Sequence, residues 1–238
     1  GSRGIGAGIS KHLKTISKET ISLSSKDLNT SKINETNQFV KKYKNADVLV
    51  LNTGGPPATD FYLISNEDWL NYFNQLFLSF AIILRDFKIN KNGFIFLISS
   101  FHIREINPNL VISNSLRVAF WSLLKSLTDI YAKNNITTIN IAPGPIDTDR
   151  IRNLNNDIQK LKDKLPLKRL GETDEIGELV KNIVLKDIKY INGTTIFMDG
   201  GKSKTLFLFS NKLLKYLKFT KITDWLYKKN LKIIVNYY

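Results

Sequence analysis

Two glycines near the start of the chain, Gly4 and Gly6, have the spacing of a loop that binds phosphate. They lie in GSRGIG (residues 1–6), at the mouth of a stretch that predicts a helix. Glycines let the backbone approach a pyrophosphate closely, and the N-terminal end of a helix favours its negative charge. We therefore expect a nucleotide phosphate here. A simple helix-capping turn is the alternative.

A second polar group, Ser24-Ser25-Lys26, follows the apolar run 20–23. In dinucleotide-binding folds an acidic residue near this place binds the 2′-hydroxyl of the ribose, whereas lysine and serine suit a 2′-phosphate. Arg3 adds a second positive charge. The pattern predicts NADP as the cofactor, and solvated surface charges at Lys26 and Arg3 are the alternative.

Two residues suited to proton transfer or anion binding follow the apolar run 94–98. His102 has an ordinary pKa of about 6.5, which suits acid–base chemistry. The alternative is a histidine packed beside the end of the strand. Arg104 could polarise a carbonyl group or bind a carboxylate, or it could be a solvated surface charge.

The elements that must position these residues alternate along the chain. We expect strands at 20–23, 48–51, 94–98, 137–141 and 194–198, and helices at 5–16, 33–44, 66–88, 114–133 and 174–185. Strands that are apolar on both faces predict a parallel sheet covered by helices. Ser65, with Asp68 three residues later, predicts the N-terminal cap of the third helix. The expected fold class is therefore α/β, with a Rossmann-type doubly wound parallel sheet.

The beginning of the sequence departs from this plan. A phosphate-binding loop needs a strand that leads into it, and here no residue precedes Gly1. We expect a sheet that is truncated at its N-terminal side, or one whose first strand comes from outside this sequence. Beyond the carboxyl end of the expected strand at 48–51, Gly54-Gly55-Pro56-Pro57 predicts a stiff turn that lines a pocket. A simple end to a loop is the alternative.

Composition excludes several classes of protein. The chain has 238 residues, 42% of them hydrophobic, which is enough for one sizeable core. It has no cysteine, and its two histidines lie too far apart for the usual spacing of a zinc site. We expect no metal. Without a signal-peptide pattern or an apolar run of about 18 residues, the expected location is cytoplasmic.

The net charge of +14 is concentrated at the C-terminal end. Residues 202–238 hold nine lysines and one acidic residue, so they carry +8 of that charge. Apolar residues between 206 and 217 share one helical face, which predicts a basic amphipathic tail in peripheral contact with a membrane. Contact with a neighbouring subunit, or no evolved role, is the alternative. No nucleic-acid-binding motif accompanies the charge, so we expect no nucleic acid partner.

From residue 1 to about 201 the sequence resembles the short-chain dehydrogenase/reductase family. GSRGIG is similar to the second half of the family's TGxxxGxG loop, Asn52-Thr53-Gly54 to its NAG motif, and Ala142-Pro143-Gly144 with Thr148 to its PG segment. Residues 165–201 resemble its closing stretch. The resemblance implies that the cofactor is bound by Ser2, Arg3, Gly4, Ile5, Gly6, Ser25, Lys26, Asn52, Gly54, Pro143, Gly144 and Thr148.

The same resemblance implies an NADP-binding and catalytic domain at 1–201, followed by the tail at 202–238. Little sequence separates Lys26 from Ile33, where the family usually has a helix and a strand, so we expect that unit to be shortened. The helices at 66–88 and 114–133 match those that join subunits in the family, which implies a homodimer or homotetramer.

The expected catalytic positions differ from the family pattern. Ser100 takes the place of the serine that binds the substrate oxygen, Ser113 that of the tyrosine acid, and Arg117 that of its lysine. Leu76 takes the place of a water-ordering asparagine. A serine hydroxyl is a much weaker acid than a phenol, and arginine does not shuttle protons. The usual proton relay is therefore absent from the sequence.

Two functions follow from the resemblance. The first is an NADP-dependent oxidoreductase acting on a small-molecule carbonyl or alcohol substrate, with 3-oxoacyl thioesters as the nearest class. The alternative is a catalytically silent module that binds NADP(H) or a partner subunit.

Overall fold

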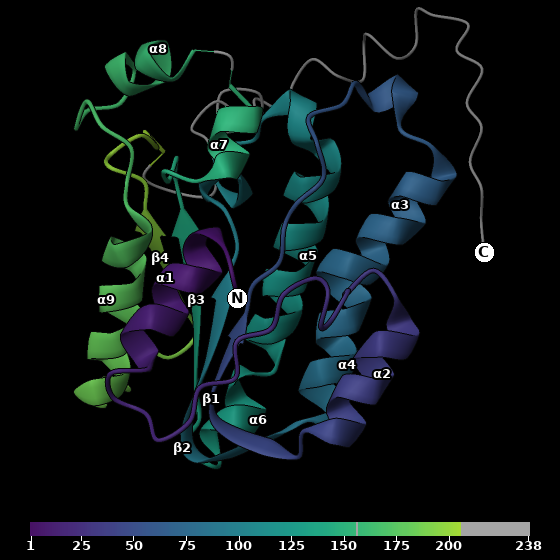
Figure 1. Cartoon of the computed structure of the whole chain (residues 1–238), viewed down its shortest axis with the longest axis vertical. Coiled ribbons are helices and arrows are strands. Elements are labelled where there is room, and N and C mark those ends of the chain that lie inside the picture. Colours follow the sequence, from purple (N-terminus) through teal and green to yellow (C-terminus); the bar gives the residue numbers. More distant parts are fainter. Residues whose placement is uncertain (156, 206–238) are drawn as a thin grey trace, which may run out of the picture. The chain divides into compact units, whose positions relative to one another are not determined.

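In the part of the chain that the computed structural model describes, residues 1–155 and 157–205, four strands form one parallel sheet. They are β1 (Asn45–Leu51), β2 (Lys88–Ile98), β3 (Thr137–Pro143) and β4 (Thr194–Met198), in that order across the sheet (Figure 1). Each contains one of the runs expected to be strands. The predicted fold class, a Rossmann-type α/β sheet, is confirmed. Of the tail predicted at 202–238, residues 206–238 lie outside the described residues.

Helices cover both faces of the sheet, because the side chains of the strands alternate between the two faces. On one face, α1 (Gly4–Leu13) and α9 (Thr173–Leu185) pack their buried isoleucines and valine against Phe96, Ile139 and Ile141. On the other face, α2 (Ile33–Lys42), α4 (Ser79–Asp86) and α5 (Val111–Ser126) pack against Ile95 and Leu97. Within the described residues no helix is both long and apolar enough to cross a bilayer.

The expected helix at 66–88 consists of three consecutive parts. They are α3 (Asn66–Phe73), the π-helical turn η2 (Asn74–Leu78) and α4, which ends at Asp86. The N-terminal cap predicted at Ser65 is confirmed. The Ser65 hydroxyl accepts a hydrogen bond from the amide of Asp68 at 3.0 Å, and the Asp68 carboxylate accepts one from the amide of Ser65. The expected helix at 114–133 begins earlier, as α5, and ends in α6 (Thr128–Ala132).

Several short elements connect the strands to the helices without having been predicted from the sequence. They are η1 (Phe61–Leu63), η3 (Phe101–Ile103), η4 (Pro108–Leu110), α7 (Asp149–Asn153) and α8 (Ile158–Asp163). All of them except α8 are five residues or shorter, so they have no room for a periodic pattern of apolar residues.

The strand predicted at 20–23 is wrong. The segment forms no hydrogen-bonded ladder with β1, β2, β3 or β4. A strand requires a neighbouring backbone, and an apolar run by itself does not supply one. Ile21 is 51% exposed, unlike a residue of a central strand, and Ser22 reaches α1 only through its hydroxyl, 3.0 Å from that of Ser10.

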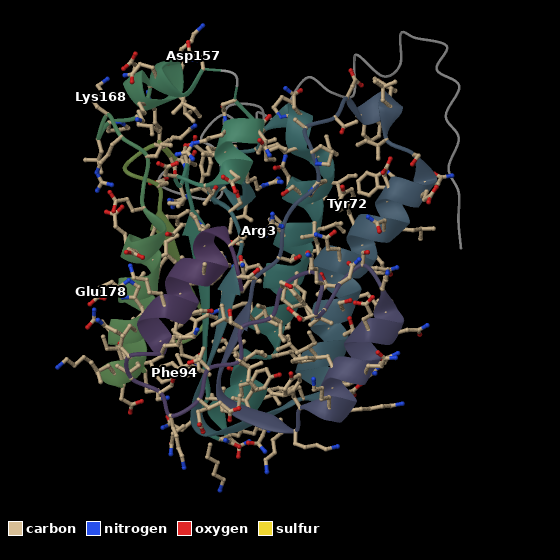
Figure 2. The ribbon with its side chains drawn as sticks, viewed as in Figure 1. Arg3, Tyr72, Phe94, Asp157, Lys168 and Glu178 are labelled. Carbon is tan, nitrogen blue, oxygen red and sulfur yellow. The ribbon has the colours of Figure 1, made fainter. Side chains whose placement is uncertain are left out.

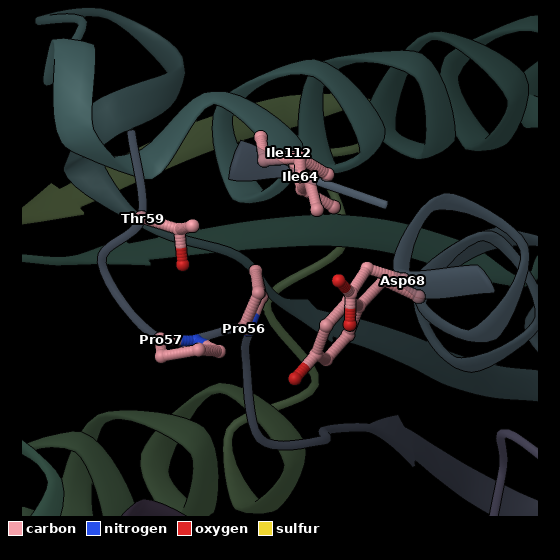
Figure 3. A pocket seen from close by; sticks show the side chains of 7 residues that line it. Pro56, Pro57, Thr59, Ile64, Asp68 and Ile112 are labelled. Carbon is pink, nitrogen blue, oxygen red and sulfur yellow. The ribbon is translucent and has the colours of Figure 1, made fainter. Parts of the chain in front are cut away.

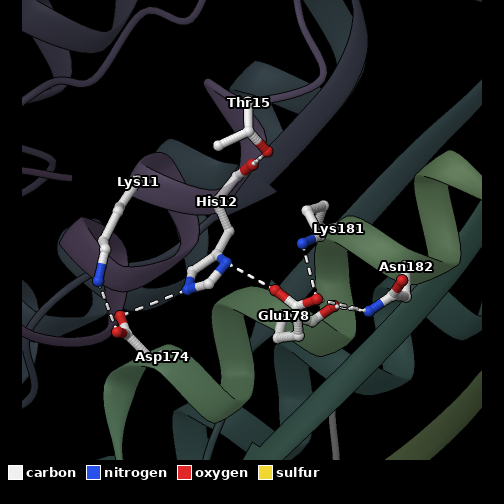
Figure 4. A network of polar contacts seen from close by, with 7 residues as sticks. All are labelled: Lys11, His12, Thr15, Asp174, Glu178, Lys181 and Asn182. Carbon is white, nitrogen blue, oxygen red and sulfur yellow. Dashed lines mark hydrogen bonds and ion pairs between the residues drawn. The ribbon is translucent and has the colours of Figure 1, made fainter.

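Helices α1 and α9 approach each other closely through two glycines. A Cβ added to Gly8 would lie 2.5 Å from the carbonyl oxygen of Thr173, and one added to Gly177 would lie 2.5 Å from that of Gly8. Figure 4 shows the polar contacts beside this crossing: the Lys11 ammonium lies 2.6 Å from Asp174, and His12 lies 2.8 Å from Glu178. This packing fixes the position of α1 and therefore of the glycine loop at its start.

Candidate functional site

The carboxyl ends of the parallel strands meet the N-terminal end of α1. β1 leads into Asn52, and the segment after β3 leads to Thr148. A Cβ on Gly6 would lie 2.9 Å from Nδ2 of Asn52, and a Cβ on Gly4 would lie 3.4 Å from Cγ2 of Thr148. Gly4 also has a φ of +52°, a conformation that favours glycine. The glycine loop, Asn52 and Thr148, predicted separately, thus lie together, and side chains larger than hydrogen would fill the cradle between them.

The remaining residues predicted to bind the cofactor lie around this edge. Gly54 continues the loop after β1, Pro143 is the last residue of β3, and Gly144 follows it. Arg3 is exposed in extended backbone at the start of α1, where Figure 2 marks it, and Ser2 is exposed before it. Ile5 is half-buried in the first turn of α1.

Ser25 and Lys26 are exposed in a turn that also contains an acidic residue. The Asp27 carboxylate accepts hydrogen bonds from the amide and the hydroxyl of Ser24, at 2.8 and 2.6 Å. These bonds hold the pKa of Asp27 below its ordinary value. Asp27 is therefore a charged residue already bound within its own turn, which leaves Ser25 and Lys26 as the exposed polar groups beside it.

A buried polar network that the sequence did not reveal supports the loop after β1. Gln75 donates from its amide to the Thr53 hydroxyl at 3.2 Å and to the Gly54 carbonyl at 3.0 Å. The Thr53 hydroxyl lies 3.3 Å from that of Thr30, and Ser79 donates to the Thr30 carbonyl. The signal in the sequence is the pair of polar residues four positions apart in an otherwise apolar helix.

Ser100 lies directly after β2 and begins the turn η3. The half-buried hydroxyl oxygen of Ser100 accepts a hydrogen bond from the amide of His102 at 3.2 Å. The hydroxyl hydrogen of Ser100 can therefore be donated to another acceptor. The His102 ring lies with Nδ1 2.8 Å from the Glu105 carbonyl, and burial lowers its pKa. Arg104 lies over the ring of Phe197 at 4.4 Å. These contacts favour a structural role for His102 and Arg104.

Ser113 and Arg117 are held together on α5. Arg117 donates from Nε to the buried Ser113 hydroxyl at 3.1 Å and from Nη1 to the Ile98 carbonyl at 3.1 Å. Burial, with the nearby charge of Arg150, lowers the pKa of Arg117 to about 10. The guanidinium therefore remains positively charged at neutral pH and binds the end of β2, next to Ser100.

Arg150, on α7, belongs to the same place although the sequence did not mark it. It donates from Nη1 to the Gly55 carbonyl at 2.8 Å and from Nη2 to the Pro56 carbonyl at 2.9 Å. It thereby connects the segment after β3 to the loop after β1. Its partners are backbone carbonyls 94 and 95 residues away, which no local pattern could reveal.

Two cavities lie beside these residues. One cavity has a volume of ≈ 130 Å³ and is lined mainly by apolar side chains (Figure 3). Its lining residues are Pro56, Pro57, Thr59, Ile64, Ile112 and, on α3, Asp68 and Tyr72. The other, of ≈ 490 Å³, is an open depression beside Gly4 and Thr148 with four carboxylates in its lining. Among the described residues no cluster of three histidine, cysteine or acidic residues could bind a metal.

The position of Leu76 offers no site for an ordered water. Leu76 is 2% exposed and packs with Ile112 and Leu116 in an apolar cluster. A water needs two or more polar partners, and this cluster is built of apolar side chains. The geometry can therefore polarise an oxygen at Ser100 and place positive charge at Arg117 and Arg150.

Comparison with known proteins gives the family of the chain. Residues 28–203 match the family model described as enoyl-(acyl carrier protein) reductase. The chain is 30% identical over 179 residues to a 3-oxoacyl-[acyl-carrier-protein] reductase FabG of Buchnera aphidicola subsp. Baizongia pistaciae, covering 73% of each chain. It is 29% identical over 174 residues to tropinone reductase-like 3 of Erythroxylum coca, covering 70% of this chain and 67% of that one.

Solved structures share the fold. A blue fluorescent protein from a metagenomic library, in complex with NADPH, matches with a TM-score of 0.76 at 22% identity and covers 85% of this chain and 95% of its own. A short-chain dehydrogenase from Burkholderia cenocepacia J2315, in complex with NADP, matches with a TM-score of 0.74 at 19% identity. The match covers 85% of this chain and 94% of that one. With the family model matching most of its length, the chain belongs to the short-chain dehydrogenase/reductase family.

Proposed function

We propose that this protein is an NADP-dependent oxidoreductase that acts on a carbonyl or alcohol substrate. The observation that carries the proposal is that Gly4 and Gly6 let the start of α1 lie against Asn52 and Thr148, at the edge of the sheet where dinucleotides bind in this kind of fold. Structural neighbours bound to NADP and NADPH support this cofactor. When bound, the cofactor supplies the hydride.

The residues of this chain then have separate roles. The glycine loop, with Ser2, Arg3 and Ile5, would hold the phosphates, while Ser25 and Lys26 would contact the 2′-phosphate. Asn52, Gly54, Pro143, Gly144 and Thr148 would line the rest of the cofactor site. Ser100 would donate a hydrogen bond from its hydroxyl to the substrate oxygen, and water or a non-standard acid would supply the proton that the reduced oxygen takes up. Arg117 would bind the ribose hydroxyls, and Ser113 would orient Arg117.

The substrate class nearest to the relatives is a 3-oxoacyl thioester, because several are 3-oxoacyl-[acyl-carrier-protein] reductases. We also propose a homodimer or homotetramer formed through α3, α4 and α5, whose surfaces include Leu70, 65% exposed, and Val118, 45% exposed. The cytoplasmic location stays a prediction.

A catalytically silent module is the second candidate, and one observation favours it. Ser113, Arg117 and Leu76 together remove the phenol, the lysine and the water site of the family's relay. Such a protein would bind NADP(H) without turning over a substrate.

Oxidation of NADPH with a panel of ketones and 3-oxoacyl thioesters separates the two candidates. We expect slow turnover that Ser100→Ala lowers by about 100- to 1,000-fold, as expected when a donor to a developing oxyanion is lost. Ser115→Ala, at an exposed position on α5, is the matched control and should leave the rate unchanged. Cofactor binding without turnover on any substrate would favour the silent module. Turnover that Ser100→Ala leaves intact would contradict the role of Ser100.

A further inference from the structure

Two guanidinium groups from distant parts of the chain converge on one point at the carboxyl edge of the sheet. A Cβ added to Gly55 would lie 2.9 Å from Nη2 of Arg150 and 3.2 Å from Nη2 of Arg117. The two Nη2 atoms therefore lie within about 6 Å of each other. Like charges at this separation repel, and the half-buried position of Arg117 limits the water that screens its side of the pair.

No acidic side chain compensates this pair in the part of the chain that the structure describes. Arg85, Arg152 and Arg169 each form an ion pair with an aspartate or glutamate. Arg117 and Arg150 instead donate to a hydroxyl and to backbone carbonyls, which carry no net charge. Asp68 lines the neighbouring cavity, but its carboxylate already accepts from the amide and the hydroxyl of Ser65.

Both arginines keep donors for a further partner. A guanidinium has five N–H groups, and the structure uses two on each arginine. Planar guanidinium groups bind carboxylates through paired hydrogen bonds, which makes a carboxylate a well-matched ligand. Desolvation lowers the pKa of both groups, although Arg150 is exposed and Tyr72 acts in the opposite direction on it.

The surroundings limit the size of the ligand. Arg117 donates from Nη1 to the carbonyl of Ile98, two residues before Ser100, so a group bound by the arginines lies near the hydroxyl proposed to meet the reacting oxygen. Pro56 accepts from Arg150 through its carbonyl and also lines the cavity of ≈ 130 Å³. A cavity of about 150 Å³ holds one benzene molecule, so this one has room for a short apolar chain.

We propose, given the oxidoreductase function proposed above, that the guanidinium of Arg150 and Nη2 of Arg117 together bind the carboxylate of a small oxo acid whose carbonyl lies one or two carbons away. The substrate would then be a free acid in place of the thioester named there, and the ribose would use the other donors of Arg117. The apolar end of such a substrate would enter the cavity between Pro56 and Ile112. The carboxylate would neutralise part of the paired positive charge, which gives the acid an advantage over any neutral analogue of the same shape.

Calorimetric titration of the full chain with acetoacetate and with its methyl ester, with NADPH present and absent, tests the proposal. We expect the acid to bind at least tenfold more tightly than the ester, and NADPH to leave the affinity for the acid undiminished. Arg150→Met should lower affinity for the acid at least tenfold while the weak affinity for the ester stays the same. Arg152→Met, two residues along the same helix and paired with Asp147, is the matched control and should change neither.

Three results would overturn the proposal. The first is equal affinity for acetoacetate and its methyl ester. The second is that Arg150→Met lowers the affinity for the acid and the affinity for the ester by the same factor. The third is competition between acetoacetate and NADPH for binding. The last would show that the arginines bind a phosphate of the cofactor. NADPH binding is measured separately, so a chain that binds NADPH without preferring the acid contradicts the carboxylate site alone. A chain that prefers the acid but binds no NADPH contradicts the cofactor function alone.

Discussion

Replacing Arg117 by lysine should give the protein a stability that depends on pH in a range where the natural protein's does not. Burial and the charge of Arg150 lower the pKa of Arg117 from its ordinary value to about 10, a shift of roughly 2.5. The same environment, acting on a lysine of ordinary pKa about 10.4, would bring its titration to about pH 8. Arg117 itself, with a pKa of about 10 in the folded chain, stays mostly charged up to about pH 9.5, and it stays charged in the unfolded chain.

The sign follows from the proton balance. In Arg117→Lys the folded protein would bind fewer protons at this position than the unfolded chain between about pH 8 and 10.4, so stability rises with pH there. From pH 7.5 to 9.5 the free energy of unfolding of the variant should gain about 2 kcal/mol relative to the natural protein. For a domain of this size that is a relative rise in melting temperature of about 4–8 °C.

Thermal unfolding of both proteins at half-unit pH steps measures this difference directly. Arg152→Lys, the same change at an exposed position paired with Asp147, should give a difference that does not vary with pH. A flat difference for Arg117→Lys as well would mean that the side chain at this position reaches water. It would refute the burial and the proximity to Arg150 from which the shift was worked out.

Three further changes test other parts of the structure. Gly177→Ala should lower the free energy of unfolding, measured by chemical denaturation, by about 2 kcal/mol, because overpacking against a backbone carbonyl exceeds the gain in helix propensity. Gly54→Ala is the control: its Cβ would meet no atom closer than 3.9 Å, so its free energy of unfolding should fall much less. Ser65→Ala should cost about 1 kcal/mol through loss of the cap, and an unchanged denaturation midpoint would contradict the capping box. Val118→Glu should shift the gel-filtration peak to the monomer, whereas a natural protein that already elutes as a monomer would disprove the interface.

The strands of the sheet could be predicted from the sequence because the apolar pattern that marks a buried strand lies within the strand segment itself. The run at 94–98 is apolar on both faces, and this is the condition of a strand buried between two layers of helices; the run at 137–141 is equally buried but carries Thr138 and Asn140 on one face. The run at 20–23 has a similar composition but no hydrogen-bonded neighbour, so the same reasoning failed there. Strand pairing depends on a second segment, and composition does not report whether that segment is present.

The same distinction holds at the candidate site. Ser113 and Arg117 lie one helical turn apart, so their spacing alone predicts that they meet. Arg150 meets Gly55 only because the ends of two strands lie at one edge of the sheet, and nothing near either residue announces the contact. The support of the loop after β1 by Gln75 likewise crosses 21 or 22 residues and depends on how α3, η2 and α4 pack.

Calorimetric titration with NADPH of the natural chain and of Gly6→Ala tests the central claim most directly. A Cβ at this position would lie 2.9 Å from Nδ2 of Asn52, inside the cradle assigned to the cofactor. We predict saturable binding of one NADPH per chain that Gly6→Ala weakens at least tenfold. No saturable binding by the natural chain, or binding that Gly6→Ala leaves unchanged, would contradict a cofactor site at this edge of the sheet.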